Sequence, residues 1–159
     1  MPYRNLQDKR AIVTGASSGI GWHLVKQLAT EGVSVIACAR RADLLEDLAN
    51  QIQSQGGTCI PVSGDITSES TRREIIDVCN REFGGLDILI NNAGIGAMGR
   101  FDESETARIR QVFEVNFFAV AEMIRDSLPS LKQGSSPIIV NMSSVLAHRA
   151  TPLKSEYCA

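Results

Sequence analysis

The stretch Thr14-Gly15-Ala16-Ser17-Ser18-Gly19-Ile20-Gly21 lies between an apolar run at residues 11–13 and an amphipathic run at residues 20–28. This order predicts a strand, a tight glycine turn and a helix. Gly15 permits a backbone conformation that a Cβ disfavours, Gly19 permits close approach of a pyrophosphate, and Gly21 permits close packing of the helix on the strand. The N–H groups at the helix start would then face the phosphates. A plain glycine turn is the alternative.

Length and composition are those of one ordinary folded domain. The chain has 159 residues, of which 43% are hydrophobic and 21% charged, and its formal net charge is −2. These values are typical of a single globular domain. A nucleic-acid-binding domain usually carries a basic excess, so the composition argues against that class. The arginine pairs at 40–41 and 72–73 are too short to form a basic tract.

Apolar strand-like runs alternate with segments of helical apolar spacing. Strands are expected near residues 10–14, 33–39, 58–63, 86–91 and 137–142, and helices near 20–31, 42–55, 68–83 and 104–132. The alternation predicts an α/β fold of the Rossmann type, a doubly wound parallel sheet covered by helices on both faces. Right-handed crossovers give strand order 3-2-1-4-5, and a ligand should bind at the carboxyl ends of the strands, where that order reverses. Pro129 and Gly134 are expected to mark the end of the fourth helix.

The cysteines and the apolar segments bear on metal binding and location. The cysteines form no C-x-x-C pair, which argues against a zinc site; they are Cys38, Cys59, Cys79 and Cys158. Cys38 and Cys79 fall in predicted regular elements, so buried free thiols in a reducing compartment are expected. Residues 1–6 lack the apolar core of a signal peptide, and the apolar window 112–124 contains two glutamates. A cytoplasmic protein without a membrane span is therefore expected.

Three motifs together indicate a family. The first turn reads T-G-x-x-x-G-x-G, not the G-x-G-x-x-G of the common dinucleotide fingerprint. The fourth strand ends in the tetrapeptide 91–94, Asn-Asn-Ala-Gly, and a serine pair stands thirteen residues before Tyr157. From about residue 8 onward the chain resembles the classical short-chain dehydrogenase/reductase (SDR) family. The resemblance implies a single dinucleotide-binding Rossmann domain over residues 1–159, incomplete at its C-terminus. The extended branch of the family, which includes nucleotide-sugar epimerases, fits less well because its first turn resembles T-G-x-x-G-x-x-G.

The second strand end discriminates between cofactors. Ala39 stands where an acid would bind the adenosine ribose 2′-OH of NAD, and Arg40-Arg41 follow. A guanidinium can bind a 2′-phosphate with two hydrogen bonds. In the family an arginine at this point accompanies NADP preference, so NADP(H) is expected, with Arg40 as the main contact and Arg41 and Ser17 as weaker candidates. The alternative is that both arginines are solvated residues at a loop–helix junction.

The resemblance assigns the remaining cofactor contacts. Asp65 would accept a hydrogen bond from the adenine amino group, although a turn residue or helix cap is also compatible with its position. The tetrapeptide 91–94 would stabilise the sheet and border the adenosine ribose and the nicotinamide side of the cleft; a plain Asn-Gly turn is the alternative. The implied cofactor-binding set is Gly15, Ser17, Ser18, Gly19, Ile20, Gly21, Arg40, Arg41, Asp65, Asn92, Ala93 and Gly94.

The resemblance also implies a catalytic set, which comprises Asn116, Ser144 and Tyr157. Asn116 lies in an apolar helical run, where it is either a satisfied core amide or the family's asparagine that kinks this helix and holds a relay water. Ser144 is preferred to Ser143 because of its separation from Tyr157, and Ser143 is expected to bond backbone groups. No metal ligands are expected.

The implied reaction is hydride transfer between NADP(H) and a small carbonyl/alcohol substrate. Tyr157 would need a nearby positive charge to act as a base near neutrality, and the family supplies it through the lysine of Y-x-x-x-K. The sequence ends at Ala159, before position 161, so we expect a fragment that is a poor catalyst, from an enzyme that is a homodimer or homotetramer when complete. The competing hypothesis is a short, catalytically inactive nucleotide-binding or interaction protein.

Overall fold

Five parallel strands form the centre of the molecule, in the order β3-β2-β1-β4-β5. The computed structural model describes residues 5–159; residues 1–4, part of the segment used above to argue against a signal peptide, lie outside the described residues. The strands are β1 (Arg10–Thr14), β2 (Ser34–Ala39), β3 (Cys59–Ser63), β4 (Ile88–Asn91) and β5 (Ile138–Asn141). The predicted fold class and strand order are confirmed.

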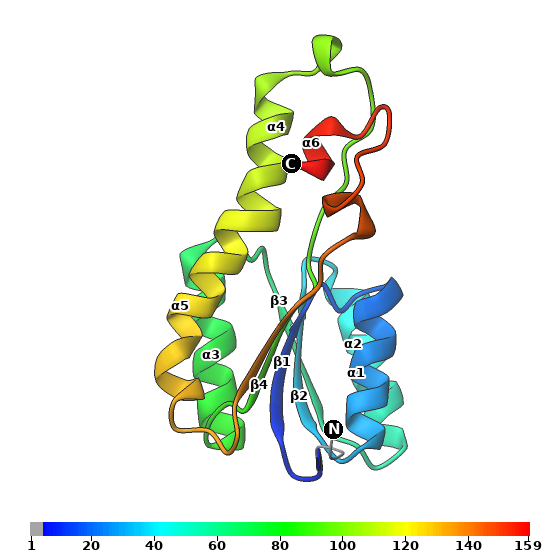
Figure 1. Cartoon of the computed structure of the whole chain (residues 1–159). Helices are drawn as coiled ribbons and strands as arrows, with labels where there is room; N and C mark the ends of the chain where they lie inside the picture. The colour runs from blue at the N-terminus through cyan, green and yellow to red at the C-terminus, as the bar shows by residue number, and fades with distance from the viewer. Residues whose placement is uncertain (1–4) are drawn as a thin grey trace.

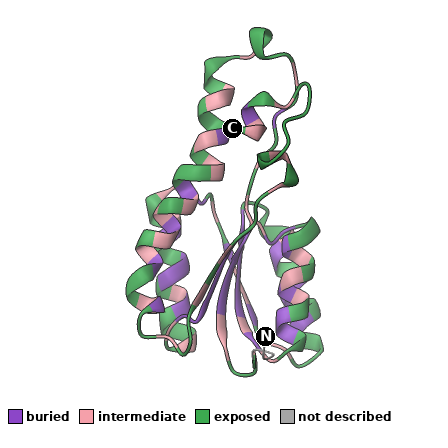
Figure 2. Ribbon diagram, in the orientation of Figure 1, coloured by how far each residue is buried: buried purple, intermediate pink, exposed green. Residues whose placement is uncertain are grey.

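Two pairs of helices cover the two faces of the sheet (Figure 1). On one face lie α1 (Gly19–Thr30) and α2 (Ala42–Ser54), and on the other lie α3 (Glu69–Phe83) and α5 (Ala119–Leu131). Alternate residues of β1 face the two layers, because Val13 packs with α1 and α2 while Ile12 packs with α3 and α5. The buried residues follow the sheet and the helix faces turned toward it (Figure 2). The core therefore lies between the sheet and its helices, along the strands and not beyond their carboxyl ends.

The long fourth helix of the sequence analysis is divided. A 3-10 turn, η1 (Phe101–Glu103), precedes α4 (Thr106–Phe113), and a π-helical turn, η2 (Glu114–Phe118), separates α4 from α5. Pro129 lies inside α5 rather than at its end, which corrects the prediction. A proline removes only one backbone donor, and the last turn remains packed because Leu131 is buried in the core.

The segments around α4 extend beyond the carboxyl ends of the strands (Figure 1). After β5 the chain forms η3 (Val145–Ala147) and α6 (Ser155–Cys158), and α6 lies against α4. The backbone N–H of Gly99 donates to Leu153 O at 2.9 Å, which joins the loop after β4 to the segment before α6. Between residues 5 and 159, no helix combines the length and apolar character needed to cross a membrane.

An ion pair lies at the opposite end of the sheet, where the strands begin. Asp87, just before β4, accepts bonds from the Arg10 backbone N–H and guanidinium at 2.9–3.0 Å. It also accepts from the Ser135 N–H at 2.6 Å. The bond from the Arg10 guanidinium is the main cause that lowers the pKa of Asp87 to about 2. Burial acts against this shift, and the two backbone N–H groups add to it. The starts of β1, β4 and β5 are thus joined by one buried carboxylate.

Candidate functional site

The first turn is shaped by glycines that the protein's own backbone requires. Gly15, which follows β1, has φ +69°, and a Cβ there would lie 2.7 Å from Ala93 Cα. A Cβ on Gly21 would lie 2.4 Å from Gly15 O and 2.5 Å from the Asn92 side-chain nitrogen. Gly21 therefore lets α1 pack against the turn itself and against the end of β4, in addition to any role toward a ligand.

The start of α1 suits an anion. The N-cap residue Ser18 is extended and makes no side-chain capping bond, and the first turn of this described helix contains no acid. Its leading N–H groups are therefore free of side-chain acceptors from the cap, and the positive end of the helix dipole is not neutralised. The turn thus fits the pyrophosphate of a dinucleotide.

Arg41 lies over this turn. Its Nη2 donates to Ser17 Oγ at 2.9 Å and to Ser18 Oγ at 2.7 Å, and its Nε donates to Ser17 Oγ at 3.2 Å. Arg40 is exposed and lines the same half of the cleft, next to Ala39. The structure thus holds the guanidinium of Arg41 beside the glycine turn, whereas the sequence analysis expected Arg40 as the main contact and Arg41 as a weaker candidate.

Asp65 follows β3 and faces the same half of the cleft, which has a volume of about 560 Å³. Its Oδ1 accepts bonds from the Thr67 N–H at 3.0 Å and the Thr67 hydroxyl at 2.9 Å. The turn role considered in the sequence analysis is therefore present. It is compatible with binding an adenine amino group, because both of these bonds use one carboxylate oxygen and leave Oδ2 for a ligand.

The tetrapeptide after β4 is bonded to the first turn. Thr14 Oγ1 accepts from the N–H groups of Asn92 and Ala93, both at 3.1 Å. The Asn92 side chain donates to Thr14 O at 3.0 Å and to Gly15 O at 3.2 Å. Gly94 lines both halves of the cleft. The segment therefore fixes the spacing between the ends of β1 and β4.

Asn116 lies in the π-helical turn, half-buried. Its side chain makes a pair of bonds with one backbone residue: Oδ1 accepts from Ile95 N–H, and Nδ2 donates to Ile95 O, both at 2.9 Å. Both ends of the amide are thus held by the loop after β4, with one N–H donor and one oxygen lone pair left over. A π-helical turn leaves local carbonyls displaced from the regular ladder, which suits the irregularity that the resemblance implied here.

The second half of the cleft, about 660 Å³, brings together the three implied catalytic residues, Asn116, Ser144 and Tyr157. Ser144 caps η3, and its Oγ accepts from the Leu146 N–H at 3.2 Å. The backbone-bonding role expected for Ser143 thus belongs to Ser144, whose hydroxyl proton remains free to donate. Tyr157 stands on α6.

The sequence analysis missed a charged cluster around Glu156, the residue before Tyr157. The Glu156 carboxylate is fully buried and pairs with Arg108 of α4 at 2.5 Å, and the Ser104 hydroxyl also donates to it. The hydrogen bond from the Ser104 hydroxyl is the largest cause that lowers the pKa of Glu156 to about 2, and the bond from Arg108 is the second. No sequence pattern marks this pairing, since its members lie about fifty residues apart.

The described residues show no cluster of three or more His, Cys, Asp or Glu side chains that could hold a metal ion. The three buried cysteines are free thiols, and burial raises the pKa of each to about 12; they are Cys38, Cys59 and Cys79. These thiols stay protonated near neutrality and pack as small apolar groups.

Residues 9–159 match the short chain dehydrogenase family model. The chain belongs to the short-chain dehydrogenase/reductase family. This finding accounts for the sheet order, the glycine turn and the cleft described above.

Curated relatives and solved structures agree with the family. The chain is 40% identical over 156 residues to a short chain dehydrogenase of Pseudocercospora fijiensis, covering 97% of this chain and 50% of that protein. It is 33% identical over 151 residues to human dehydrogenase/reductase SDR family member 11, covering 92% and 58%. The chain thus spans about half the length of the curated relatives it matches.

Two solved structures superpose closely. A short-chain dehydrogenase/reductase from Mycobacterium marinum gives a TM-score of 0.91 at 29% identity, covering 97% of this chain and 64% of that one. An alcohol dehydrogenase from the archaeon Thermococcus sibiricus, complexed with 5-hydroxy-NADP, gives 0.88 at 29% identity, covering 94% and 64%.

Proposed function

We propose that the whole protein is an NADP(H)-dependent oxidoreductase that interconverts a carbonyl and an alcohol by hydride transfer. The observation that carries the choice of cofactor is the position of Arg41, whose guanidinium lies on the hydroxyls of Ser17 and Ser18 beside Ala39. A guanidinium there attracts a 2′-phosphate, while the missing acid removes the usual partner of the NAD ribose. Arg40, at the same edge, is the second phosphate contact.

The residues fit a dinucleotide along the cleft. The start of α1 and the turn before it would hold the pyrophosphate, Asp65 the adenine, and residues 92–94 the ribose and nicotinamide side. When bound, the nicotinamide supplies the hydride-transfer chemistry. The protein's own residues would orient the substrate and transfer one proton to or from the substrate oxygen.

Ser144 and Tyr157 have this task in the second half of the cleft. The Ser144 hydroxyl would donate to the substrate oxygen, and the Tyr157 phenol would give a proton to that oxygen in reduction or take it in oxidation. Asn116, through its irregular helical turn, would hold the water that leads the proton away. A tyrosine acts as a base near neutrality only beside a positive charge, which the family places four residues after it.

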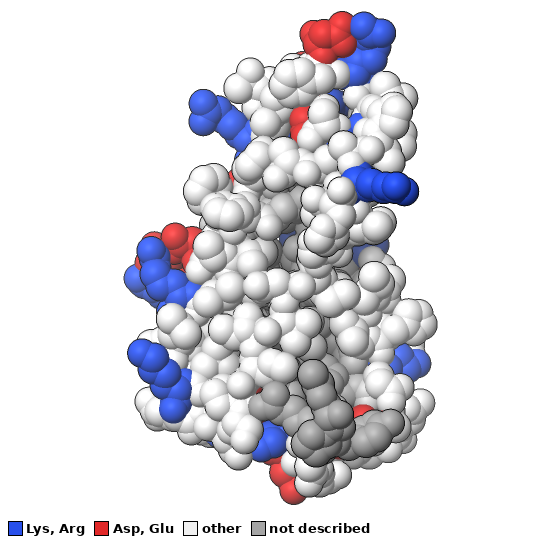
Figure 3. All heavy atoms as spheres, in the orientation of Figure 1, with Lys and Arg blue, Asp and Glu red and all other residues white. Residues whose placement is uncertain are grey.

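The proposal extends to partners and location. Small carbonyl or alcohol molecules are the expected substrates, in a cytoplasmic homodimer or homotetramer that binds neither nucleic acid nor membrane. The net charge of −2 argues against nucleic-acid binding. On the face shown in Figure 3, basic and acidic side chains are scattered and form no continuous basic patch among the described residues.

Comparison of NADPH and NADH binding tests the proposal. Nucleotide fluorescence would give the dissociation constants for the parent protein and for Arg40→Ala, Arg41→Ala and Ala39→Asp. We expect the parent to prefer NADPH by about tenfold or more, since a hydrogen bond to a charged group is worth roughly 1.5–3 kcal/mol. Each arginine variant should lose affinity for NADPH and keep its affinity for NADH, whereas Ala39→Asp should move the preference toward NADH.

The matched control is Arg73→Ala, which removes an exposed arginine paired with Glu69 on α3, away from the cleft. It should bind both nucleotides as the parent does. Equal affinities of the parent for NADPH and NADH would refute the choice of cofactor, and the absence of binding to either would refute the enzyme proposal.

A further inference from the structure

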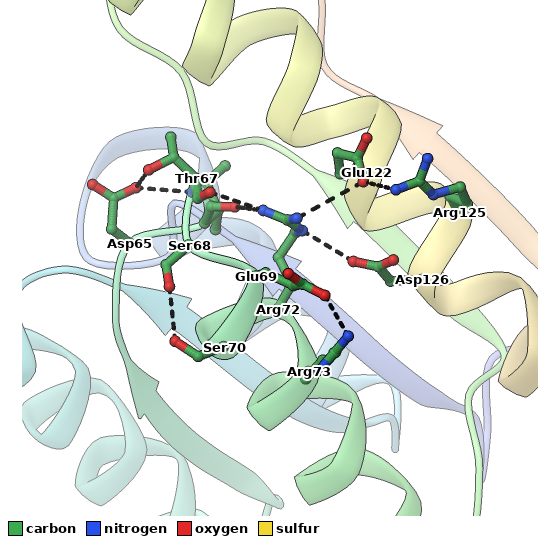
Figure 4. Close-up of polar contacts among 11 residues, drawn as sticks. Asp65, Thr67, Ser68, Glu69, Ser70, Arg72, Arg73, Glu122, Arg125 and Asp126 are labelled. Atoms are coloured by element: carbon green, nitrogen blue, oxygen red, sulfur yellow. Dashed lines mark hydrogen bonds and ion pairs between the residues drawn. The ribbon is translucent and has the colours of Figure 1, made fainter.

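Arg72 is a buried charge that the proposed chemistry does not use. It stands in the first turn of α3, and its side chain is only 7% exposed. A buried guanidinium is costly unless its donors and its charge find partners. Figure 4 shows that it lies between the loop after β3 and the helix α5, with contacts to both.

Toward the loop, one nitrogen of Arg72 holds two backbone carbonyls. Nη1 donates to Ile66 O at 2.9 Å and to Thr67 O at 3.0 Å. Thr67 in turn holds Asp65 through its N–H and hydroxyl. Arg72 is therefore connected to the Asp65 carboxylate through a single residue, and it fixes the backbone that sets the direction of that carboxylate.

Toward α5, the remaining nitrogens of Arg72 meet two acids. Nε donates to Asp126 Oδ2 at 3.0 Å, and Nη2 lies 3.8 Å from Glu122 Oε2. These carboxylates compensate the buried charge and set the plane of the guanidinium. The arrangement needs the rigid fork of arginine, because an ammonium is a compact point charge that cannot present fixed donors to the loop and to α5 together.

We propose that Arg72 is a positioning residue for the adenine end of the dinucleotide. It anchors the loop 65–67 to α5 so that the free oxygen of Asp65 faces the cleft and accepts the adenine amino group. The inference rests on the proposed function, because it presupposes that the cleft binds a dinucleotide. Its consequence is that selectivity for the adenine amino group depends on a guanidinium that never touches the cofactor.

The test compares NADPH with its reduced hypoxanthine analogue, in which a carbonyl oxygen replaces the adenine amino group. The carboxylate of Asp65 accepts from an amino group and repels a carbonyl oxygen, so the parent should bind NADPH about tenfold or more tightly than the analogue. Arg72→Lys should reduce this ratio to about threefold or less, mainly by weakening NADPH binding. A purely structural role would weaken both ligands equally and leave the ratio unchanged, which would overturn the proposal.

The neighbouring Arg73→Lys is the matched control, since Arg73 is on the same helix, is 70% exposed and pairs with Glu69 of its own helix. It should keep the parent ratio. If Arg72→Lys does not fold, Asp126→Ala decides. The Asp126 side chain is 23% exposed, its loss releases Arg72 Nε, and the ratio should fall measurably below that of the parent. An unchanged ratio in this variant would overturn the proposal.

Binding by the unmutated protein distinguishes a failure of this inference from a failure of the proposed function. Binding of NADPH without preference over the hypoxanthine analogue would overturn the role of Asp65, and with it the role of Arg72, while the proposed function stands. Failure of the parent to bind either ligand would refute the proposed function itself.

Discussion

Asp87→Asn should lower the free energy of unfolding at pH 7 by about 2–4 kcal/mol, because it removes the charge that joins three strand starts. Asp87 Oδ2 accepts from the backbone N–H and Nε of Arg10, and Oδ1 accepts from Nη2 and from the Ser135 N–H. An amide offers one oxygen and one NH₂ group, so in either orientation two of these four donors would face another donor. The Arg10 guanidinium would also lose its counter-charge.

The lowered pKa of Asp87 predicts how the electrostatic part of this loss in the free energy of unfolding depends on pH. The pKa of Asp87 is lowered from 3.8 to about 2 in the folded protein, which corresponds to about 2 kcal/mol. Because the folded pKa is the lower one, this stabilisation is complete above about pH 5 and is lost as the pH falls through 3.8 toward 2. Near pH 3 about half of it should remain. Asparagine does not titrate, so the difference between parent and variant should shrink over the same range.

Urea unfolding of the parent and Asp87→Asn, at pH 7 and at steps down to pH 3, measures both quantities. Asp102→Asn is the control, because Asp102 is 65% exposed and its pairing with Arg100 should be worth well under 1 kcal/mol. The reasoning would be refuted if Asp87→Asn cost no more than Asp102→Asn at pH 7. It would also be refuted if the cost did not decline as the pH fell below 4.

Two further predictions concern the cleft. Ser144→Ala should lower turnover by about 100- to 1,000-fold with little change in NADPH affinity, since one donor to a developing oxyanion is worth roughly 3–4 kcal/mol. Steady-state kinetics and fluorescence binding measure these two quantities. Normal turnover of Ser144→Ala, together with an inactive Ser143→Ala, would transfer the role to Ser143. Gly21→Ala should lower the free energy of unfolding by about 1–3 kcal/mol and weaken NADPH binding, because its Cβ would overlap the Gly15 carbonyl. Urea unfolding measures the change in stability. Gly96→Ala, where a Cβ meets nothing within 4 Å, is the control.

The sheet and its helices could be predicted because apolar spacing reports which faces are buried. The apolar residues at helical spacing in α2 are Leu44, Leu45, Leu48 and Ile52; the last three are buried against the sheet, and Leu44 is half-buried. The same reasoning could not divide the long helix around Asn116, because a π-helical turn changes the hydrogen-bond register without changing the local composition. It also overrated Pro129 as a helix end, since packing of the last turn outweighed one missing donor.

The charged contacts of the site could not be predicted, because a charged residue in a sequence does not reveal its partner. Arg72 and Arg73 are neighbours in the sequence, yet the first is buried between two elements and the second is solvent-exposed on the same helix. The partner of Arg72, Asp126, is 54 residues away. The pairing of Glu156 with Arg108 is of the same kind, and only the fold brings such groups together.

The residues that carry the resemblance to the family are bonded to one another. Thr14 Oγ1 accepts two N–H groups of the segment after β4, and the Asn92 side chain returns two bonds to the carbonyls of Thr14 and Gly15. The glycine turn therefore reaches its shape through bonds to a strand end about eighty residues away. Bonds within the protein that hold the turn in this shape would lower the cost of ordering it when a ligand binds. The glycine turn and the tetrapeptide 91–94 thus share one bonded network, which is a physical reason for the two motifs to occur together.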